Sequence, residues 1–286
     1  MTTLQNKIDF GVVFRVKNAN PNGDPLNGNR PRVTYDGLGE LTDVCLKRKI
    51  RNRLMEAGKP IFVQSDDNKV DKHPNLKSRA EGVLSSEKTV EGKIDKSCST
   101  WFDVRAFGQL FPFKGAAKRG KGKEGEEAGD DKGVSIGIRG PVSVQSAFSI
   151  APVSHLVTSN QITKSTSNEG DGINRQPDQM GMKHRVDQGI YVFFGSMNPQ
   201  LANKTRFSDG DAAAMKEVLP RLFENDASSA RPEGSMEVLK VVWWKHNCKA
   251  GQYSSAKVHR TLSVQSDGSI KLDTLDGLTP EILDGF

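Results

Sequence analysis

The sequence predicts an α+β fold whose elements follow the order strand, helix, strand, strand, helix, strand. Three observations predict it: an apolar segment with a two-residue period near the start, two segments with the apolar spacing of amphipathic helices, and further alternating or apolar runs between and after them. Long polar insertions separate these elements. With 286 residues the chain can bury a sizeable core, as one large domain or two small ones.

The first element is a strand followed by a long turn. Residues 8–16 alternate between apolar and other side chains, broken only by Val13, which predicts a half-buried strand. The turn at 18–30 is rich in asparagine, glycine, aspartate and proline, which tolerate a positive φ or bond to their own backbone.

The first helix is predicted over residues 42–57. Thr42 or Asp43 can cap it, an apolar stripe repeats every four residues from Leu46 to Leu54, and the following Gly-Lys-Pro sequence ends it. After a polar, weakly patterned insertion, the next predicted element is a strand at 101–107.

The middle of the chain contains two biased insertions. Segment 114–132 places basic residues before acidic ones and has no large apolar side chain, so it is predicted to be a mobile loop in the free protein. Residues 142–150 alternate clearly, which predicts a strand with one face in the core. A long polar excursion, 158–188, then precedes the apolar run 190–194.

The last third supplies a helix and a strand. The second helix is predicted around 211–222, where Pro220 should kink or shorten it, and the run 238–245 is predicted as a closing strand. Without the insertions, this order is the βαββαβ plan of the RNA-recognition-motif or ferredoxin-like fold.

The composition favours a polyanionic partner. The 41 lysines and arginines exceed the 35 aspartates and glutamates, which gives a net charge of +6. No apolar run is long enough to span a bilayer and the first seven residues lack the apolar segment of a secretion signal, so we expect a cytoplasmic protein without membrane contact. The cysteines and histidines show no metal-ligand spacing, so we expect no metal, no cofactor and three buried cysteines.

The most informative feature is the helix segment LKRKIRNRL at 46–54, which holds five positive charges. Lys47 and Arg51 are four residues apart, as are Lys49 and Arg53, so each pair projects on one side of the helix beside the apolar stripe. Such rows match the spacing of phosphates. The alternative is a solvated basic face on an ordinary surface helix.

Polar groups outside this helix also suit a nucleic acid. Asn20 and Asn22 are candidate donors to sugar or phosphate, although a long turn is the simpler account of this segment. Segment 139–148 has no aromatic side chain where RNA-recognition motifs stack bases. Ser143 and Gln145 therefore remain as a small polar surface for a backbone without sequence readout.

The sequence offers little for catalysis. It contains no GxSxG, HExxH or Walker motif. Asp24 and Asp36 could act as acids in the loop before the first helix, but no positioned partner is evident, and turn-forming aspartates are the simpler interpretation.

Taken together, these segments resemble the RAMP-type backbone subunits of CRISPR Cascade complexes, and closely the type I-C member. The NPNGDP turn at 20–25 and the LKR sequence at 46–48 carry the resemblance most specifically, and segments 102–108, 138–146 and 222–231 continue it. The resemblance implies a non-catalytic protein of an antiviral complex that polymerises along CRISPR RNA. Its thumb would displace one base at regular intervals and leave the guide free to pair with target DNA.

The resemblance also implies a hand-shaped division of one discontinuous domain. The expected parts are a palm at about 1–59, 98–111, 134–154 and 189–286, helical fingers at about 60–97 and 112–133, and a thumb hairpin at about 155–188. The expected partners are CRISPR RNA, target DNA reached through the guide, copies of the chain in a helical filament, and the large, small and guide-end-capping subunits of Cascade.

Carried over by position, the family's phosphate-binding helix residues fall on Thr42, Lys47 and Arg51. In the thumb, Met180 or Met182 would wedge a base. The full set of expected RNA-binding residues is Asn20, Asn22, Thr42, Lys47, Arg48, Arg51, Ser143, Gln145, Met180, Lys183 and Arg185. The residues expected to reach target DNA are Lys114, Lys118, Arg119, Lys121 and Lys123.

Two alternatives remain. Relatives in type III complexes cut target RNA with an aspartate in the loop before the first helix, so an endoribonuclease that uses Asp24 or Asp36 is the first. A general coat protein for single-stranded nucleic acid is the second.

Overall fold

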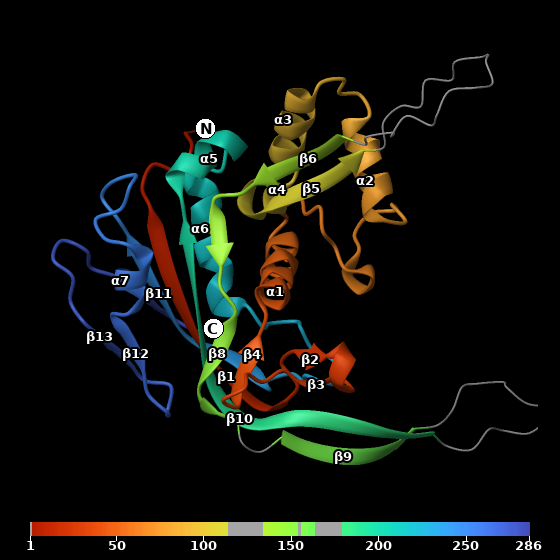
Figure 1. The fold of residues 1–286 in the computed structure, drawn as a ribbon, viewed down its shortest axis with the longest axis vertical. Helices are drawn as coiled ribbons and strands as arrows, with labels where there is room; N and C mark the ends of the chain where they lie inside the picture. Colours follow the sequence, from red (N-terminus) through yellow and green to blue (C-terminus); the bar gives the residue numbers. More distant parts are fainter. Residues whose placement is uncertain (1, 114–133, 154–155, 164–178) are drawn as a thin grey trace, which may run out of the picture.

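The computed structural model describes residues 2–113, 134–153, 156–163 and 179–286 (Figure 1). It mixes helices with one large antiparallel sheet. In spatial order, the strands of that sheet are β14 (Glu281–Asp284), β11 (Met236–Lys245), β1 (Ile8–Ala19), β10 (Gln179–Met197), β8 (Ala147–Pro152) and β4 (Leu38–Leu41). Two further strands, β7 (Val142–Val144) and β9 (Leu156–Thr163), also pair with β10.

The predicted first strand lies at the centre of this sheet. β1 pairs along its length with β10 on one side and β11 on the other, and it is buried on both faces rather than one. β11, predicted to close the fold, is an inner strand, because β14 pairs with its outer side. A strand covered on both faces explains why Val13 interrupts the alternation: it faces a second apolar layer.

Helices cover one face of the sheet (Figure 1). They are α1 (Asp43–Glu56), α6 (Asp209–Val218) and the shorter α5 (Pro199–Thr205). The predicted stripe Leu46, Ile50 and Leu54 is fully buried and joins the main core. As predicted from Pro220, α6 ends early, and a 3-10 turn, η3 (Leu219–Arg221), continues the chain.

The C-terminal segment covers the opposite face, which the sequence did not predict. It contains α7 (Ser255–His259), β12 (Leu262–Val264) and β13 (Ile270–Leu272), and it packs on Val13, Val242 and Trp244 of the sheet. We call residues 246–278 the C-terminal cap. The cap lies over the part of this face formed by β1, β11 and the adjoining part of β10.

A smaller core lies beside α1, formed by two helices of the predicted insertion and by the elements after it. These are α2 (Leu76–Leu84), α3 (Val90–Thr100), α4 (Phe102–Phe107), β5 (Gly108–Phe113) and β6 (Val134–Arg139). The remaining elements are short. They are the paired strands β2 (Gly23–Asp24) and β3 (Arg30–Pro31) and the 3-10 turns η1 (Pro25–Asn27) and η2 (Asp66–Asn68).

The prediction of a strand at 101–107 is wrong, because Phe102–Phe107 is the helix α4. Phe102 and Ala106, four residues apart, face the main core, while Trp101 and Val104, three apart, face the smaller core. A short helix wedged between two cores is apolar on two sides, and over seven residues that pattern imitates a strand.

The predicted strand 142–150 is two strands with a one-residue offset between them. Val144 pairs with Gly195, whereas Phe148 pairs with Val192, so the β7–β8 side has one residue more than β10. This bulge reverses the faces, so that Phe148, predicted to face the core, is 39% exposed.

The predicted thumb segment contains a hairpin in which β9 pairs with the first part of β10, from Leu156 opposite Val186 to Thr163 opposite Gln179. Figure 1 shows this hairpin leaving the sheet as an arm. The prediction of three buried cysteines holds for Cys98 alone. Cys45 is partly exposed, and Cys248 is exposed because it lies in the loop after β11. No helix in the described ranges is long and apolar enough to cross a membrane.

Candidate nucleic-acid interface

Two of the predicted residues, Asn22 and Thr42, meet at the N-terminal end of α1. The Thr42 hydroxyl accepts from the Cys45 amide at 3.3 Å and so caps the helix. The amide and hydroxyl of Thr42 both donate to Asn22 Oδ1, at 3.0 and 3.1 Å. The turn after β1 therefore holds the start of the helix. These two bonds use only the oxygen of the Asn22 side chain and not its NH2 group.

Asn20 is a turn residue in this structure. It is 3% exposed, its Nδ2 donates to the Asn29 carbonyl at 2.7 Å, and its backbone amide donates to the Ala230 carbonyl at 2.8 Å. Its Oδ1 is buried without a partner among the described residues. Asn20 thus shapes the turn and presents no exposed donor.

A third segment, 226–231, reaches the same place and was not singled out as a site from the sequence. Asp226 pairs with Lys49 of α1 and with Arg231 Nε, the latter at 3.0 Å. Backbone bonds between Ser228 and Arg231 in both directions make a tight turn beside Asn20. Only its place in segment 222–231 of the resemblance could have pointed to it, because nothing in its own spacing indicates chemistry.

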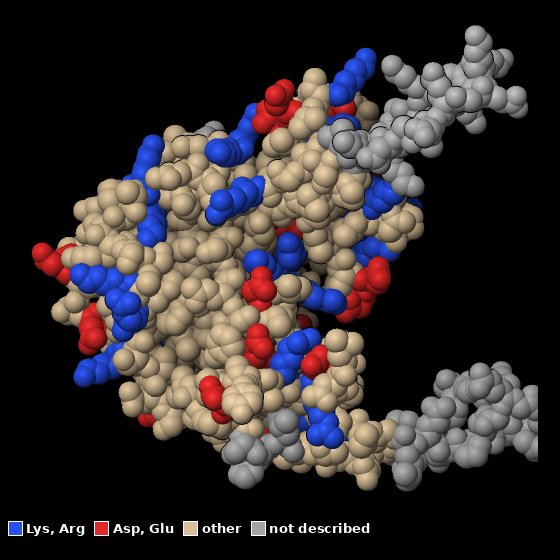
Figure 2. All heavy atoms as spheres, viewed as in Figure 1, with Lys and Arg blue, Asp and Glu red and all other residues tan. Residues whose placement is uncertain are grey.

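Carboxylates accompany the cations of α1. Each of the five has an acidic partner: Lys47 with Asp43, Arg48 with Asp67, Lys49 with Asp226, Arg51 with Asp103 and Arg53 with Glu56. Figure 2 shows basic and acidic side chains next to one another in the region of this helix. The helix therefore has a mixed-charge surface and not the unbroken basic row that the sequence suggested.

These cations differ in how far their side chains are exposed. Lys49 and Arg53 are 3% and 8% exposed, so the prediction that they project beside the apolar stripe is wrong. Burial lowers the pKa of Lys49, and Asp226 opposes this. The Arg51 side chain is 13% exposed, and its Nε donates to the buried Asp103 at 2.9 Å. Lys47 and Arg48, at 24% and 56%, are the accessible cations.

Ser143 and Gln145 are exposed but do not join this group. The neighbouring Val142 and Val144 belong to the main core beneath α1, and successive side chains of a strand point to opposite faces. Ser143 and Gln145 therefore lie on the face away from α1, where the Ser143 and Ser196 hydroxyls bond at 2.9 Å.

Lys183 and Arg185, predicted as thumb residues, lie two positions apart on β10 and are partly exposed. The alternate positions include His184, which is buried and bonds to the Thr158 hydroxyl at 2.9 Å, and Met182, which is 68% exposed. The side chain of Met180 and the predicted DNA-contacting residues lie outside the described part of the structure. The latter are Lys114, Lys118, Arg119, Lys121 and Lys123.

Asp24 and Asp36, the candidate acids of the endoribonuclease alternative, both lie in turns. Asp24 Oδ1 accepts from the Leu26 amide at 3.2 Å and from Arg32 at 3.3 Å, which are contacts of a turn-forming residue. Asp36 is exposed in the turn before β4. Among the described residues, no group of three or more His, Cys, Asp or Glu side chains is placed to hold a metal ion.

Comparison with known proteins places the chain in context. The model of the CRISPR-associated protein Cas7 family matches residues 6–277. A CRISPR-associated protein Cas7 of Haloferax volcanii is 27% identical over 288 aligned positions, which cover 99% of this chain and 82% of the relative.

Two solved chains superpose partially. A chain of a CRISPR RNA-guided surveillance complex in a pre-nicking state has a TM-score of 0.42 at 11% identity, covering 83% of this chain and 78% of that one. A chain of another CRISPR RNA-guided surveillance complex has a TM-score of 0.42 at 15% identity, covering 92% and 77%.

Proposed function

Because the chain belongs to the CRISPR-associated protein Cas7 family, we propose that it is a guide-RNA-binding backbone subunit of a type I Cascade complex. Several copies line up along one CRISPR RNA, contact the large, small and end-capping subunits, and leave the guide free to pair with target DNA. The observation that carries the proposal is the match of the family model to nearly the whole chain. The NPNGDP turn and the LKR helix favour the type I-C member.

We further propose a hand-like division of labour. The strand order β11, β1, β10, β8, with α1 after β1 and α6 after β10, supports an RNA-recognition-motif-like palm. The fingers are assigned to the unit with the smaller core, which also includes residues of 98–111 and 134–138 that were expected in the palm. The thumb is assigned to the β9–β10 hairpin. The RNA backbone passes the N-terminal half of α1, where Asn22 bonds to Thr42 and where Lys47 and Arg48 are the accessible cations.

Phosphates exchange with carboxylates at this site. The Arg48–Asp67 pair is exposed and the Lys47–Asp43 pair is partly exposed, so each contributes little to stability and an RNA phosphate can replace either acid at small cost. Arg51 is also a phosphate ligand in this proposal. Its Nε keeps the bond to Asp103, and its two terminal nitrogens donate to the RNA.

The proposal is tested by the salt dependence of RNA binding. Lys47→Ala with Arg48→Ala should weaken binding equally for different base sequences. It should also reduce the log-log salt slope by about 1.4, at about 0.7 per phosphate contact on a single strand. Fluorescence anisotropy against salt concentration measures both. The matched control is Lys72→Ala with Lys77→Ala, which removes the same charge from exposed positions near α2. Equal slopes for all three proteins would remove Lys47 and Arg48 from the interface.

The chain is proposed not to cut RNA. The turn contacts of Asp24 support this, because its carboxylate already accepts from a backbone amide and an arginine. Cleavage of labelled RNA that is lost in Asp24→Ala or Asp36→Ala would instead favour the endoribonuclease.

A further inference from the structure

A cavity of about 450 Å3 opens between the C-terminal end of α1 and segment 59–71, and none of the residues proposed to bind RNA lines it. Its apolar wall consists of Met55, Pro60, Ile61, Val70 and Trp101. We call it the Trp101 pocket. Its volume falls within the roughly 300–1,000 Å3 of sites that take small molecules, which is ample for one aromatic side chain.

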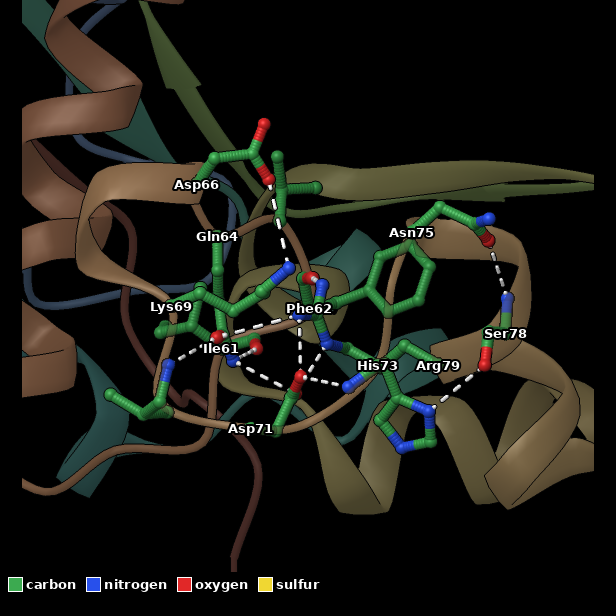
Figure 3. A network of polar contacts seen from close by, with 12 residues as sticks. Ile61, Phe62, Gln64, Asp66, Lys69, Asp71, His73, Asn75, Ser78 and Arg79 are labelled. Atoms are coloured by element: carbon green, nitrogen blue, oxygen red, sulfur yellow. Dashed lines mark hydrogen bonds and ion pairs between the residues drawn. The ribbon is translucent and has the colours of Figure 1, made fainter.

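A satisfied polar network shapes this pocket (Figure 3). Arg79, 4% exposed, donates twice to Asp71, at 2.6 and 2.8 Å, and once to the Phe62 carbonyl at 2.8 Å. The Gln64 amide donates to the Ile61 carbonyl at 2.8 Å and accepts from the Val70 amide at 3.1 Å. Because these groups bond to each other, they offer little to a polar ligand, and the pocket is a preformed apolar site.

Lys59 is the exception among the charged residues at the pocket. In the parts of the chain that are described, no carboxylate pairs with its ammonium group, although it lines the cavity. The pocket therefore suits an apolar or aromatic side chain that is followed by an acid.

The chain itself displays such a pair on another surface. Tyr35 has a relative exposure of 105%, so it packs against nothing, and Asp36 beside it is exposed without an ion-pair partner among the described residues. The turn that carries them is fixed by Thr34, which bonds to Leu38 through its backbone amide at 2.8 Å and its hydroxyl at 3.1 Å. Tyrosine is among the residue types enriched at the energetic centres of interfaces, and a segment already fixed in a turn loses little entropy on binding.

We propose that Tyr35 of one copy of this chain inserts into the Trp101 pocket of the next copy, with Asp36 paired to Lys59 across the contact. Anchor and pocket are different surfaces of the same chain, so the contact is heterologous and adds copies in one direction. This inference rests on the proposed function, because in that proposal the length of the RNA sets how many copies line up. None of the residues in this contact is among those proposed to bind RNA.

Charge reversal tests the pairing. Asp36→Lys places two lysines at every contact, and Lys59→Asp places two aspartates there, so neither variant alone should assemble on a guide-length RNA. An equimolar mixture should assemble, because alternating copies then join opposite charges at every contact. Sedimentation velocity measures the assembled mass. Assembly by either variant alone, or no recovery in the mixture, would overturn the pairing.

Removal of the anchor tests the apolar half. Tyr35→Ala should weaken association between copies about 30-fold, which corresponds to about 2 kcal/mol per contact. The control is Leu26→Ala, whose side chain is 98% exposed on the neighbouring turn η1 and should not matter. Wild-type assembly by Tyr35→Ala would refute the anchor.

Binding of a single copy to a short RNA separates this inference from the proposed function. It should be unchanged in Tyr35→Ala, and its loss would place Tyr35 at the RNA and overturn the contact. Wild-type protein that binds short RNA but never forms multiple copies on long RNA would also overturn the contact, while RNA binding by the chain would stand. Wild-type protein that binds no RNA would overturn the proposed function as well.

Discussion

At the scale of single residues, one buried carboxylate joins three segments. Asp103 is 1% exposed and accepts from Arg51 Nε at 2.9 Å and from the amides of Phe62 and Val63 at 2.7 and 3.0 Å. It connects α4 to α1 and to the backbone at Phe62 and Val63. Arg51, predicted from its spacing as a phosphate ligand, therefore also has a structural role.

We expect Asp103→Ala to lower the free energy of unfolding by about 3–5 kcal/mol, because it leaves a nearly buried guanidinium and two amides without their acceptor. Urea denaturation followed by circular dichroism measures this. Asp67→Ala, which removes the exposed partner of Arg48, is the control and should cost less than about 1 kcal/mol. Similar losses in the two variants would contradict a structural role for Asp103.

The pH dependence of stability should report on Asp71. Hydrogen bonds from Arg79 lower the pKa of Asp71 from 3.8 to about 2 (Figure 3). The ionised carboxylate therefore stabilises the fold above pH 3.8, and this contribution is lost as the pH falls from 3.8 towards 2. Asp71→Asn should unfold at a lower temperature than wild type at neutral pH, and the difference should shrink over that interval.

Thermal unfolding at a series of pH values measures this difference. Asp66→Asn, in the same segment but 98% exposed, is the matched control and should follow wild type throughout. A difference between wild type and Asp71→Asn that does not change with pH would show that Asp71 acts by shape and not by charge.

At the scale of elements, the β9–β10 hairpin is an extension of a core strand. From Met197 back to Val186, which is 1% exposed, β10 pairs with β1, and from Val186 to Gln179 it pairs with β9. This hairpin is thus anchored in the sheet at one end. Its buried His184 bonds to Thr158 within the hairpin, so both can be removed together.

Deleting residues 158–185 should therefore leave the unfolding midpoint close to that of wild type, while the spacing of copies on RNA becomes irregular. Nuclease digestion of bound RNA measures spacing as a ladder of protected fragments. Binding of one copy to a short RNA serves as the internal control. A regular ladder from the deletion variant would refute the placement of the thumb.

At the scale of the whole molecule, the main sheet is covered on both faces, and a buried charge cluster joins the sheet to the C-terminal cap. Asp9 of β1 is fully buried and accepts from His246 Nε2 at 2.9 Å, while Lys7 Nζ lies at 3.3 Å and His259 Nε2 at 3.3 Å. His246 Nδ1 accepts from the Gln252 amide at 2.9 Å, so its proton is on Nε2. Burial raises the pKa of Asp9, but the hydrogen bond from His246 and the nearby His259 and Lys7 outweigh this and hold the pKa well below its usual range.

Asp9→Ala should lower the free energy of unfolding by about 3–5 kcal/mol, because it leaves buried polar groups unpaired. The cap should also become more sensitive to trypsin, which limited proteolysis with mass spectrometry detects. The control is Glu237→Ala, which removes an exposed ion pair with Arg15 between β1 and β11. It should cost less than about 1 kcal/mol. Cleavage of the cap no faster than in this control would show that Asp9 does not hold it.

Local pattern sufficed for the elements whose signal is short-range. The start of β1, the stripe and cap of α1, and the early end of α6 at Pro220 depend on neighbours within a turn or two, and each was predicted. Local pattern failed for α4, because this helix packs on two apolar cores at once. It also failed between β7 and β8, because one extra residue there changes the face to which the side chains point.

The sequence by itself determined the family resemblance, the first strand and helix and the basic character of that helix, because apolar period, capping and charge are written in adjacent residues. Only the tertiary structure decided which cations remain accessible, since Arg51 and Lys49 meet their acids 52 and 177 residues away. It also decided that the C-terminal cap covers the second face of the sheet, because such pairings arise when distant segments pack together, and no local pattern encodes them.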